Sequence, residues 1–201
     1  MRYRMIGFLI VVTMYVSINA AVTFPVRMSD ENGSRLWLRM DTSNTAEIHF
    51  SGTIDKTISL AIDALKCSWN GRPVSFILKH TLKTPIGSYT IDTRHGGDAI
   101  INSSTSIGLL YGTYTLLRLQ YTGADLTALH LSESPALRYR ILDQWDNLDG
   151  TIERGYAGKS LWHWTDLPEK LSRRYMEYAR ANASVGINGT VLNNVNAAAE
   201  I

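Results

Sequence analysis

The order of apolar segments in the last third of the chain most constrains its fold. Residues 137–145 have the apolar content of a β-strand, and residues 187–192 predict a second one. Between them, Asp166 opens a predicted helix, with Pro168 and Glu169 in its first turn as in a capping box. A helix that joins two neighbouring strands of one sheet makes those strands parallel. The sequence therefore predicts one β-α-β crossover unit.

Crossover units of this kind repeat in the (β/α)8 barrel, which needs about 250 residues. Residues 135–201 leave room for only the first unit of such a barrel. The final residues, 197–201, add no element that could close it. We therefore expect residues 135–201 to be the start of a truncated (β/α)8 barrel, and the chain to be the N-terminal fragment of a longer protein.

The first residues have the three parts of a secretory signal peptide. Arg2 and Arg4 supply positive charge, residues 6–18 are apolar, and Ala20 and Ala21 offer small side chains for cleavage. A membrane-spanning helix needs about 20 apolar residues, so a permanent anchor is the weaker alternative. We expect residues 1–21 to be removed and the mature protein to be secreted or periplasmic, with no membrane association after cleavage.

Residues 22–134 alternate between strand and helix patterns. The expected strands are residues 36–38, 47–50, 74–78, 89–93 and 99–102, and the expected helices are residues 55–69 and 107–121. The second helix carries one charge, Arg118, and has Gly108 and Gly112 on one face, so it should be largely buried. The prediction is an α+β non-catalytic domain in which two helices cover one face of an antiparallel sheet.

Charge and cysteine content exclude several kinds of partner and site. The chain has 20 basic and 18 acidic residues, and a net charge of +2 argues against nucleic acid or an anionic membrane as partner. Cys67 is the single cysteine, so neither an internal disulfide nor a cysteine metal site can form. The sequence has no histidine pair at ligand spacing and no glycine-rich phosphate loop after a strand. We expect neither a metal nor a cofactor.

Residues 144–164 form the segment richest in candidate binding side chains. This segment includes a predicted loop of about 20 residues, longer than most strand-to-helix connections, and long loops often carry function. It holds three of the five tryptophans, with carboxylates, an amide, an arginine and a tyrosine nearby: Asp146, Asn147, Glu153, Arg154 and Tyr156. Sugars have apolar C–H faces and polar rims, so this mixture suits a sugar site. The alternative is an ordinary loop pinned by buried tryptophans.

Residues 145–162, WDNLDGTIERGYAGKSLW, resemble the start of the catalytic domain of glycoside hydrolase family 67. Residues 106–112, SIGLLYG, and the LLRL of residues 116–119 are similar to the end of that family's N-terminal domain. The loop motif is long and specific, whereas the helix motif also occurs in hexosaminidase-like enzymes. The resemblance implies an α-glucuronidase that removes glucuronic acid or its 4-O-methyl ether from xylan-derived oligosaccharides by inversion. A homodimer is left open for the full-length protein.

The family's catalytic acid and base lie at the ends of later barrel strands, so the resemblance assigns no catalytic residue in this chain. The substrate-binding residues that it implies are Trp145, Glu153, Arg154, Asn194 and Val195. For Asn194 and Val195, a structural role in capping the end of the strand is an equal alternative to substrate binding. Side chains of a strand alternate between faces, so Trp145 and Asp146 cannot both face a pocket. We favour Trp145, because a flat ring suits a sugar face and a carboxylate would repel glucuronate.

Two other functions stay open at this point. One is a hexosaminidase-like hydrolase on the same scaffold, which should not need the loop motif. The other is a non-catalytic carbohydrate-binding module that uses the clustered tryptophans. Such a module should cover its last strand, whereas here the strand at residues 187–192 would be an open edge. We therefore expect the 201-residue chain to be inactive alone.

Overall fold

The structure is a computed structural model that describes residues 46–81 and 83–194. The predicted signal peptide, the predicted strand at residues 36–38, Val195 and residues 197–201 lie outside the described residues. No helix in the described part of the chain is long and apolar enough to cross a membrane.

The first unit is a five-stranded sheet. Its strands are β1 (Ile48–His49), β2 (Val74–Leu78), β3 (Tyr89–Asp92), β4 (Ala99–Ser103) and β5 (His130–Glu133). They lie in the order β1-β2-β4-β3-β5. β1 pairs with β2 and β2 with β4 in parallel, whereas β3 is antiparallel to both β4 and β5. The prediction of an antiparallel sheet is therefore wrong, and the sheet is mixed. The helix between β1 and β2 returns the chain to the end of the sheet at which β1 began, so these two strands are parallel.

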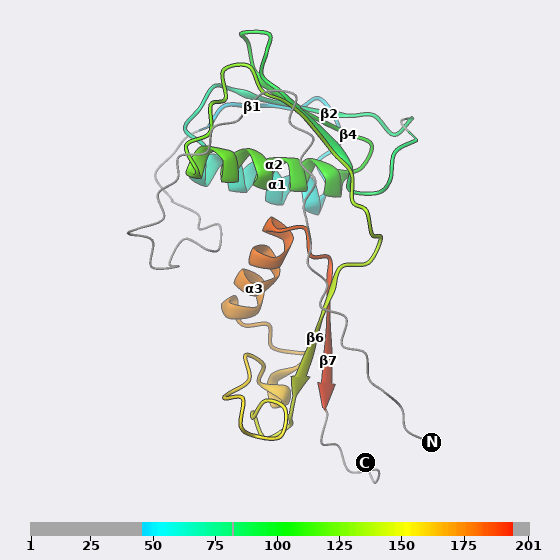
Figure 1. Cartoon of the computed structure of the whole chain (residues 1–201), viewed down its shortest axis with the longest axis vertical. Coiled ribbons are helices and arrows are strands. Elements are labelled where there is room, and N and C mark those ends of the chain that lie inside the picture. Colours follow the sequence, from blue (N-terminus) through cyan, green and yellow to red (C-terminus); the bar gives the residue numbers. More distant parts are fainter. Residues whose placement is uncertain (1–45, 82, 195–201) are drawn as a thin grey trace.

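Two helices cover one face of this sheet, as predicted (Figure 1). They are α1 (Lys56–Ser68) and α2 (Ser106–Tyr121), and every residue of α2 from Gly108 to Leu117 is buried. Asp55 caps α1 by accepting from Ile58 N at 2.7 Å, and its other carboxylate oxygen accepts from Ser106 Oγ at 2.5 Å. These two hydrogen bonds, that to Ser106 first, lower the pKa of Asp55. One carboxylate thus ties together the N-termini of both helices.

The two glycines on one face of α2 allow it to lie close to the sheet. A Cβ at Gly112 would lie 2.6 Å from Ile101 Cγ2, and one at Gly108 would overlap Ser103 Oγ and the Ser88 carbonyl oxygen. The prediction that these glycines serve packing agrees with this geometry.

Gly108→Ala is expected to lower the free energy of unfolding by about 1–3 kcal/mol, because the backbone oxygen of Ser88 cannot move aside easily. Gly97→Ala is the matched control, since a Cβ there meets nothing within 4 Å. Urea unfolding of both variants measures the difference. Equal stability of the two variants would contradict the packing role.

The second unit contains the predicted crossover. β6 (Ile141–Asp146) and β7 (Gly189–Asn194) are parallel, in a register that runs from Ile141 opposite Gly189 to Asp146 opposite Asn194. The helix between them, α3 (Arg173–Ser184), begins after Ser172 and not at Asp166. Residues Trp164–Asp166 form a short 3-10 helix, and Leu167 is extended, the conformation that steric contact with Pro168 favours. The predicted capping box at Asp166 is therefore wrong.

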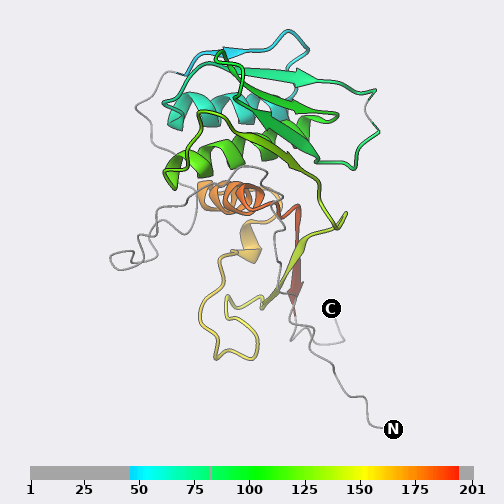
Figure 2. The same ribbon diagram turned by 45° about the horizontal axis from the view of Figure 1, so that its top comes forward.

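The two units are packed together through α3, which lies against α2 on the side away from the sheet (Figure 2). Arg118 Nη1 on α2 donates to the Ser184 carbonyl at 2.5 Å, at the end of α3. Arg140, just before β6, donates through Nε to the Gly186 carbonyl and through Nη2 to Tyr111 Oη at 3.3 Å. Two arginines therefore satisfy backbone carbonyls at the turn that follows α3.

Candidate functional site

The alternation of β6 gives its side chains two different environments. Gln144 faces α3, because its Nε2 donates to Tyr178 Oη at 2.6 Å, and Asp146 shares that face. Asp146 is 2% exposed, and its Oδ2 has no hydrogen-bond partner among the described residues. Trp145 points to the opposite face and is 50% exposed. The strand continues through Asp146, so the side chains of Trp145 and Asp146 lie on opposite faces of it. A pocket on one face of β6 can therefore be lined by only one of them.

Asp143 connects Trp145 with β7 on that open face. Trp145 Nε1 donates to Asp143 Oδ2 at 3.1 Å, and Asn193 Nδ2 donates to Asp143 Oδ1. Asn193 is the register partner of Trp145, whereas Asn194 is opposite Asp146 and shares the other face. The structure therefore brings Asn193, not the predicted Asn194, next to Trp145. The alternation of β7 could have identified Asn193, had the register been known.

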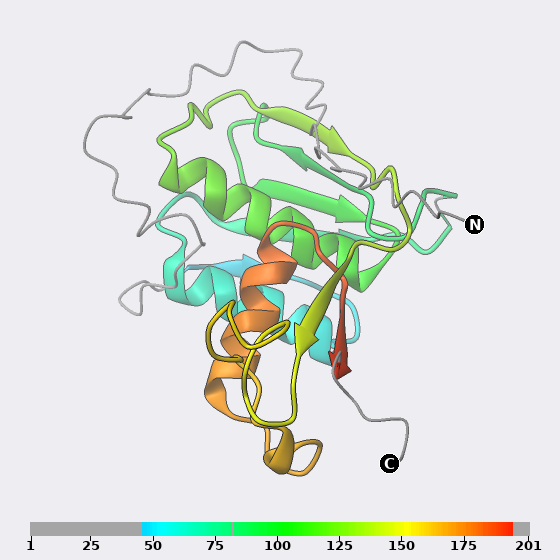
Figure 3. The same ribbon diagram turned by 60° about the horizontal axis from the view of Figure 1, so that its bottom comes forward.

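The loop after β6 folds back onto the end of the strand. Glu153 N donates to the Trp145 carbonyl at 2.7 Å, and Asn147 Nδ2 donates to the Glu153 carbonyl at 2.7 Å. Glu153 has a positive φ of 53°, the one such non-glycine residue among those described. The loop lies next to the arrowhead ends of β6 and β7 (Figure 3). Predicted residues Trp145 and Glu153 are thus neighbours.

Charged groups line the outer part of this loop. Arg154 is exposed, directly after half-buried Glu153. The Glu153 carboxylate accepts from the Tyr156 hydroxyl, and this hydrogen bond and the negative charge raise the pKa of Tyr156. Asp149 accepts from the hydroxyl and from the backbone N–H of Thr151, and these hydrogen bonds, that of the hydroxyl first, lower the pKa of Asp149. The loop therefore presents one exposed guanidinium while its carboxylates are held by local hydrogen bonds.

The far end of the loop is anchored on α3 by an aromatic cluster. The ring of Trp162 lies 4.7 Å from that of Tyr175 and 5.5 Å from that of Tyr178, measured between centroids. His163 N donates to Tyr175 Oη at 2.7 Å. The interpretation as a loop pinned by tryptophans therefore fits Trp162, but not the half-exposed Trp145.

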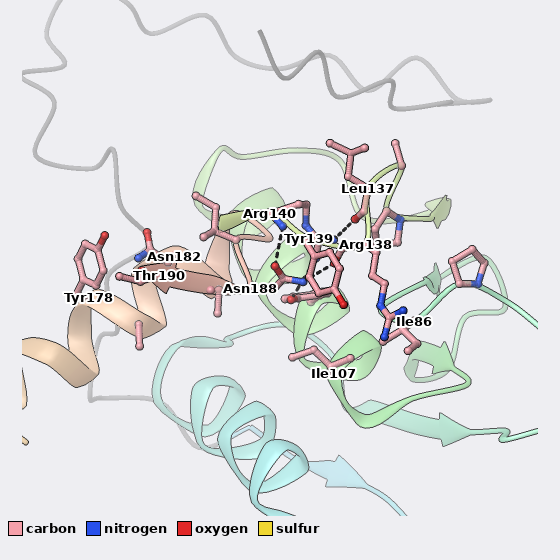
Figure 4. A pocket seen from close by; sticks show the side chains of 18 of the residues that line it. Ile86, Ile107, Leu137, Arg138, Tyr139, Arg140, Tyr178, Asn182, Asn188 and Thr190 are labelled. Atoms are coloured by element: carbon pink, nitrogen blue, oxygen red, sulfur yellow. Dashed lines mark hydrogen bonds between the residues drawn. The ribbon is translucent and has the colours of Figure 1, made fainter. Parts of the chain in front are cut away.

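A cavity of about 960 Å³ lies elsewhere, at the amino-terminal ends of β6 and β7 and between α2 and α3 (Figure 4). Its walls include Ile107, Tyr111, Leu137, Arg140 and Asn188. No aspartate or glutamate lines it among the described residues, and Arg140 is already bound to Gly186 and Tyr111. Glycoside hydrolysis by two carboxylates needs acidic side chains, so this cavity does not suit that chemistry.

A polar cluster at the edge of the first sheet also resembles a reactive site. Ser75 Oγ donates to Asp98 Oδ2 at 2.5 Å, and His49 Nδ1 contacts the same oxygen at 2.7 Å. A nucleophilic serine would have to donate to the histidine, which is not the arrangement here. The described residues also include no group of three or more His, Cys, Asp or Glu side chains that could hold a metal ion. We interpret the cluster as structural.

The contribution of this Ser75–Asp98–His49 cluster to the stability of the fold should depend on pH. Hydrogen bonds to Asp98 first, and to Glu47 second, raise the pKa of His49, while Ser75 and then His49 lower the pKa of Asp98. A raised histidine pKa stabilises the fold below about pH 6.5, and this contribution is lost as the pH rises through the raised pKa. His49→Ala should therefore destabilise the protein more at pH 5.5 than at pH 8.5 in thermal unfolding, relative to His80→Ala on an exposed turn. An equal loss at both pH values would contradict the pair.

Comparisons with known proteins give the context for this geometry. Residues 119–201 match the sequence profile of the glycosyl hydrolase family 67 middle domain. Two probable α-glucuronidases A are similar to the chain: that of Neosartorya fischeri is 43% identical over 107 residues, and that of Aspergillus terreus is 41% identical over 106. Each alignment covers 53% of this chain but only 12% of the relative.

A solved structure is also similar in fold. It is a family GH115 4-O-methyl-α-glucuronidase with specificity for decorated arabinogalactans, 12% identical, with a TM-score of 0.50. The alignment covers 76% of this chain and 25% of that one. At this identity the likeness concerns the fold alone. Residues 119–201 are therefore similar to the middle domain of glycosyl hydrolase family 67, and the chain spans about an eighth of the length of the α-glucuronidases that it matches.

Proposed function

We propose that the complete protein is an α-glucuronidase that hydrolyses the bond between (4-O-methyl)glucuronic acid and xylan-derived oligosaccharides, with inversion at the anomeric carbon. The single observation that carries the proposal is Trp145: a flat, half-exposed ring at the carboxyl end of β6, within the segment that matches family 67. The relatives named probable α-glucuronidase A, about 40% identical over half of the chain, support the activity.

The described residues supply binding and orientation in this proposal. The Trp145 ring offers an apolar surface to the C–H face of the sugar, and Glu153 lies beside it through the backbone hydrogen bond to Trp145. Exposed Arg154 supplies positive charge that complements the glucuronate carboxylate. Asn194 lies opposite Asp146 in the register of β7, and its approach to the substrate, like that of Val195 outside the described residues, remains a prediction.

Inversion needs a carboxylic acid to protonate the leaving oxygen and a carboxylate about 6.5–9.5 Å away to activate water. We assign neither role to a described residue. We propose that both are supplied from later strands, and that the chain as given, residues 1–201, lacks activity by itself.

We also propose that β6, α3 and β7 form the first unit of a (β/α)8 catalytic barrel that begins near residue 135. The parallel pair, the crossover helix and a long loop at the carboxyl end of β6 support this architecture. Active sites of such barrels lie at the carboxyl ends of the strands, which is where Trp145 lies. We further propose that residues 1–21 act as a signal peptide that directs the protein to the periplasm or the exterior of the cell. We also propose that the complete protein forms a homodimer.

The test is an assay of the complete gene product on two substrates. We expect release of glucuronic acid from aldouronic acids and no hydrolysis of aryl N-acetylglucosaminides. Activity on the second substrate alone would support the hexosaminidase-like alternative and reject the proposal. Tight binding of xylo-oligosaccharides without any hydrolysis would support the binding module instead.

A further inference from the structure

We propose that Asp143 is a positioning residue of the same site, which fixes both the Trp145 ring and the Asn193 amide against the sugar. The inference rests on the proposed function and deepens it. Asp143 is exposed on β6, yet both of its carboxylate oxygens are engaged, Oδ2 by Trp145 Nε1 at 3.1 Å and Oδ1 by Asn193 Nδ2.

The arrangement follows from the strand register. Trp145 and Asn193 are directly opposite each other on parallel strands, and Asp143 lies two residues before Trp145 on the same face. A half-exposed tryptophan has few packing contacts to select one rotamer, so a charged acceptor for its indole N–H is what restricts the ring. An ordered ring loses less conformational entropy when a sugar binds to it.

The charge of Asp143 has a second consequence for substrate orientation. A carboxylate within a few ångströms of the ring disfavours any sugar orientation that brings the glucuronate carboxylate close to it. The substrate carboxylate is therefore directed away from Asp143. Asp143 thus selects one orientation of the sugar on Trp145 in addition to holding the ring.

A double-mutant cycle in the complete gene product separates these effects. Asp143→Asn retains one acceptor oxygen but replaces the other with an N–H₂ group, so it cannot accept from both donors. We expect it to lower kcat/KM on aldouronic acid about tenfold. In a Trp145→Phe background, which has no indole N–H, the one oxygen that the new asparagine retains can still accept from Asn193. Only the loss of charge then remains, so the same change should cost about twofold or less.

The control is Asp63→Asn on the exposed side of α1, which makes the same chemical change away from the site and should leave kcat/KM unchanged. The thermal midpoints of Asp143→Asn and Asp63→Asn are measured on the same samples, so that a loss of activity through unfolding is recognised. An equal loss of kcat/KM in both backgrounds would overturn the inference while leaving the proposed function intact.

The indole resonance gives a readout independent of activity. In protein labelled with ¹⁵N-tryptophan, the signal missing from Trp145→Phe identifies the Trp145 N–H. This signal should shift in Asp143→Asn and stay in place in Asp63→Asn. No shift would overturn the inference. A wild-type protein without any α-glucuronidase activity would instead reject the proposed function, and this inference with it.

Discussion

In the complete gene product, replacing Trp145 with alanine is expected to lower kcat/KM on aldouronic acids by about 30- to 1000-fold. Loss of a central aromatic binding contact costs roughly 2–4 kcal/mol, and each 1.4 kcal/mol corresponds to a factor of ten. The ring points away from α3 and is 50% exposed among residues 1–201, so it takes no part in the packing between β6 and that helix. The thermal midpoint should therefore change little, and steady-state kinetics with thermal unfolding of the same samples measures both quantities.

Leu148→Ala is a matched control for this variant, because Leu148 is 54% exposed on the adjoining loop and has no proposed role in sugar binding. It should retain the wild-type kcat/KM. If Trp145→Ala instead unfolds at a clearly lower temperature with unchanged kinetics, Trp145 is a core residue and its assignment to the sugar site is wrong.

Replacing Trp162 with alanine is expected to have the opposite profile, with a large effect on stability. Its ring is packed between Tyr175 and Tyr178 of α3, and its removal leaves a void between the loop and the helix. We expect the free energy of unfolding to fall by about 2–4 kcal/mol. Urea unfolding monitored by far-UV circular dichroism measures this change.

Trp162→Phe distinguishes packing from hydrogen bonding at this position. The indole Nε1 of Trp162 is buried and has no hydrogen-bond partner in the described part of the chain, so phenylalanine removes an unsatisfied donor and retains an aromatic ring. It should therefore be clearly more stable than Trp162→Ala. If both variants lose the same stability, the ring contacts with Tyr175 and Tyr178 do not anchor the loop.

Local patterns were sufficient to predict several elements. The apolar run at Val74–Leu78, the helical spacing within residues 55–69 and the nearly uncharged helix Ser106–Tyr121 all depend on neighbouring residues in the sequence. The crossover between β6 and β7 was also predictable from the order of the elements along the chain. When a single helix joins two neighbouring strands of one sheet, those strands are normally parallel.

Features that depend on distant contacts were not predictable in this way. β5, residues His130–Glu133, has only Leu131 as a buried apolar residue, and its pairing with β3 decides that it is a strand. The mixed character of the first sheet also depends on which strands become neighbours. At the candidate site, Asn193 was missed because its proximity to Trp145 depends on the register of β7 against β6.

A crystal structure of the complete gene product with glucuronic acid bound would test the central claim most directly. We predict that the sugar ring lies against the face of Trp145, on the side of β6 opposite to α3. Asp143 should still accept hydrogen bonds from the Trp145 indole and the Asn193 amide, as in the free protein. A sugar bound without contact to Trp145, for example in the cavity beside Arg140, would contradict the account.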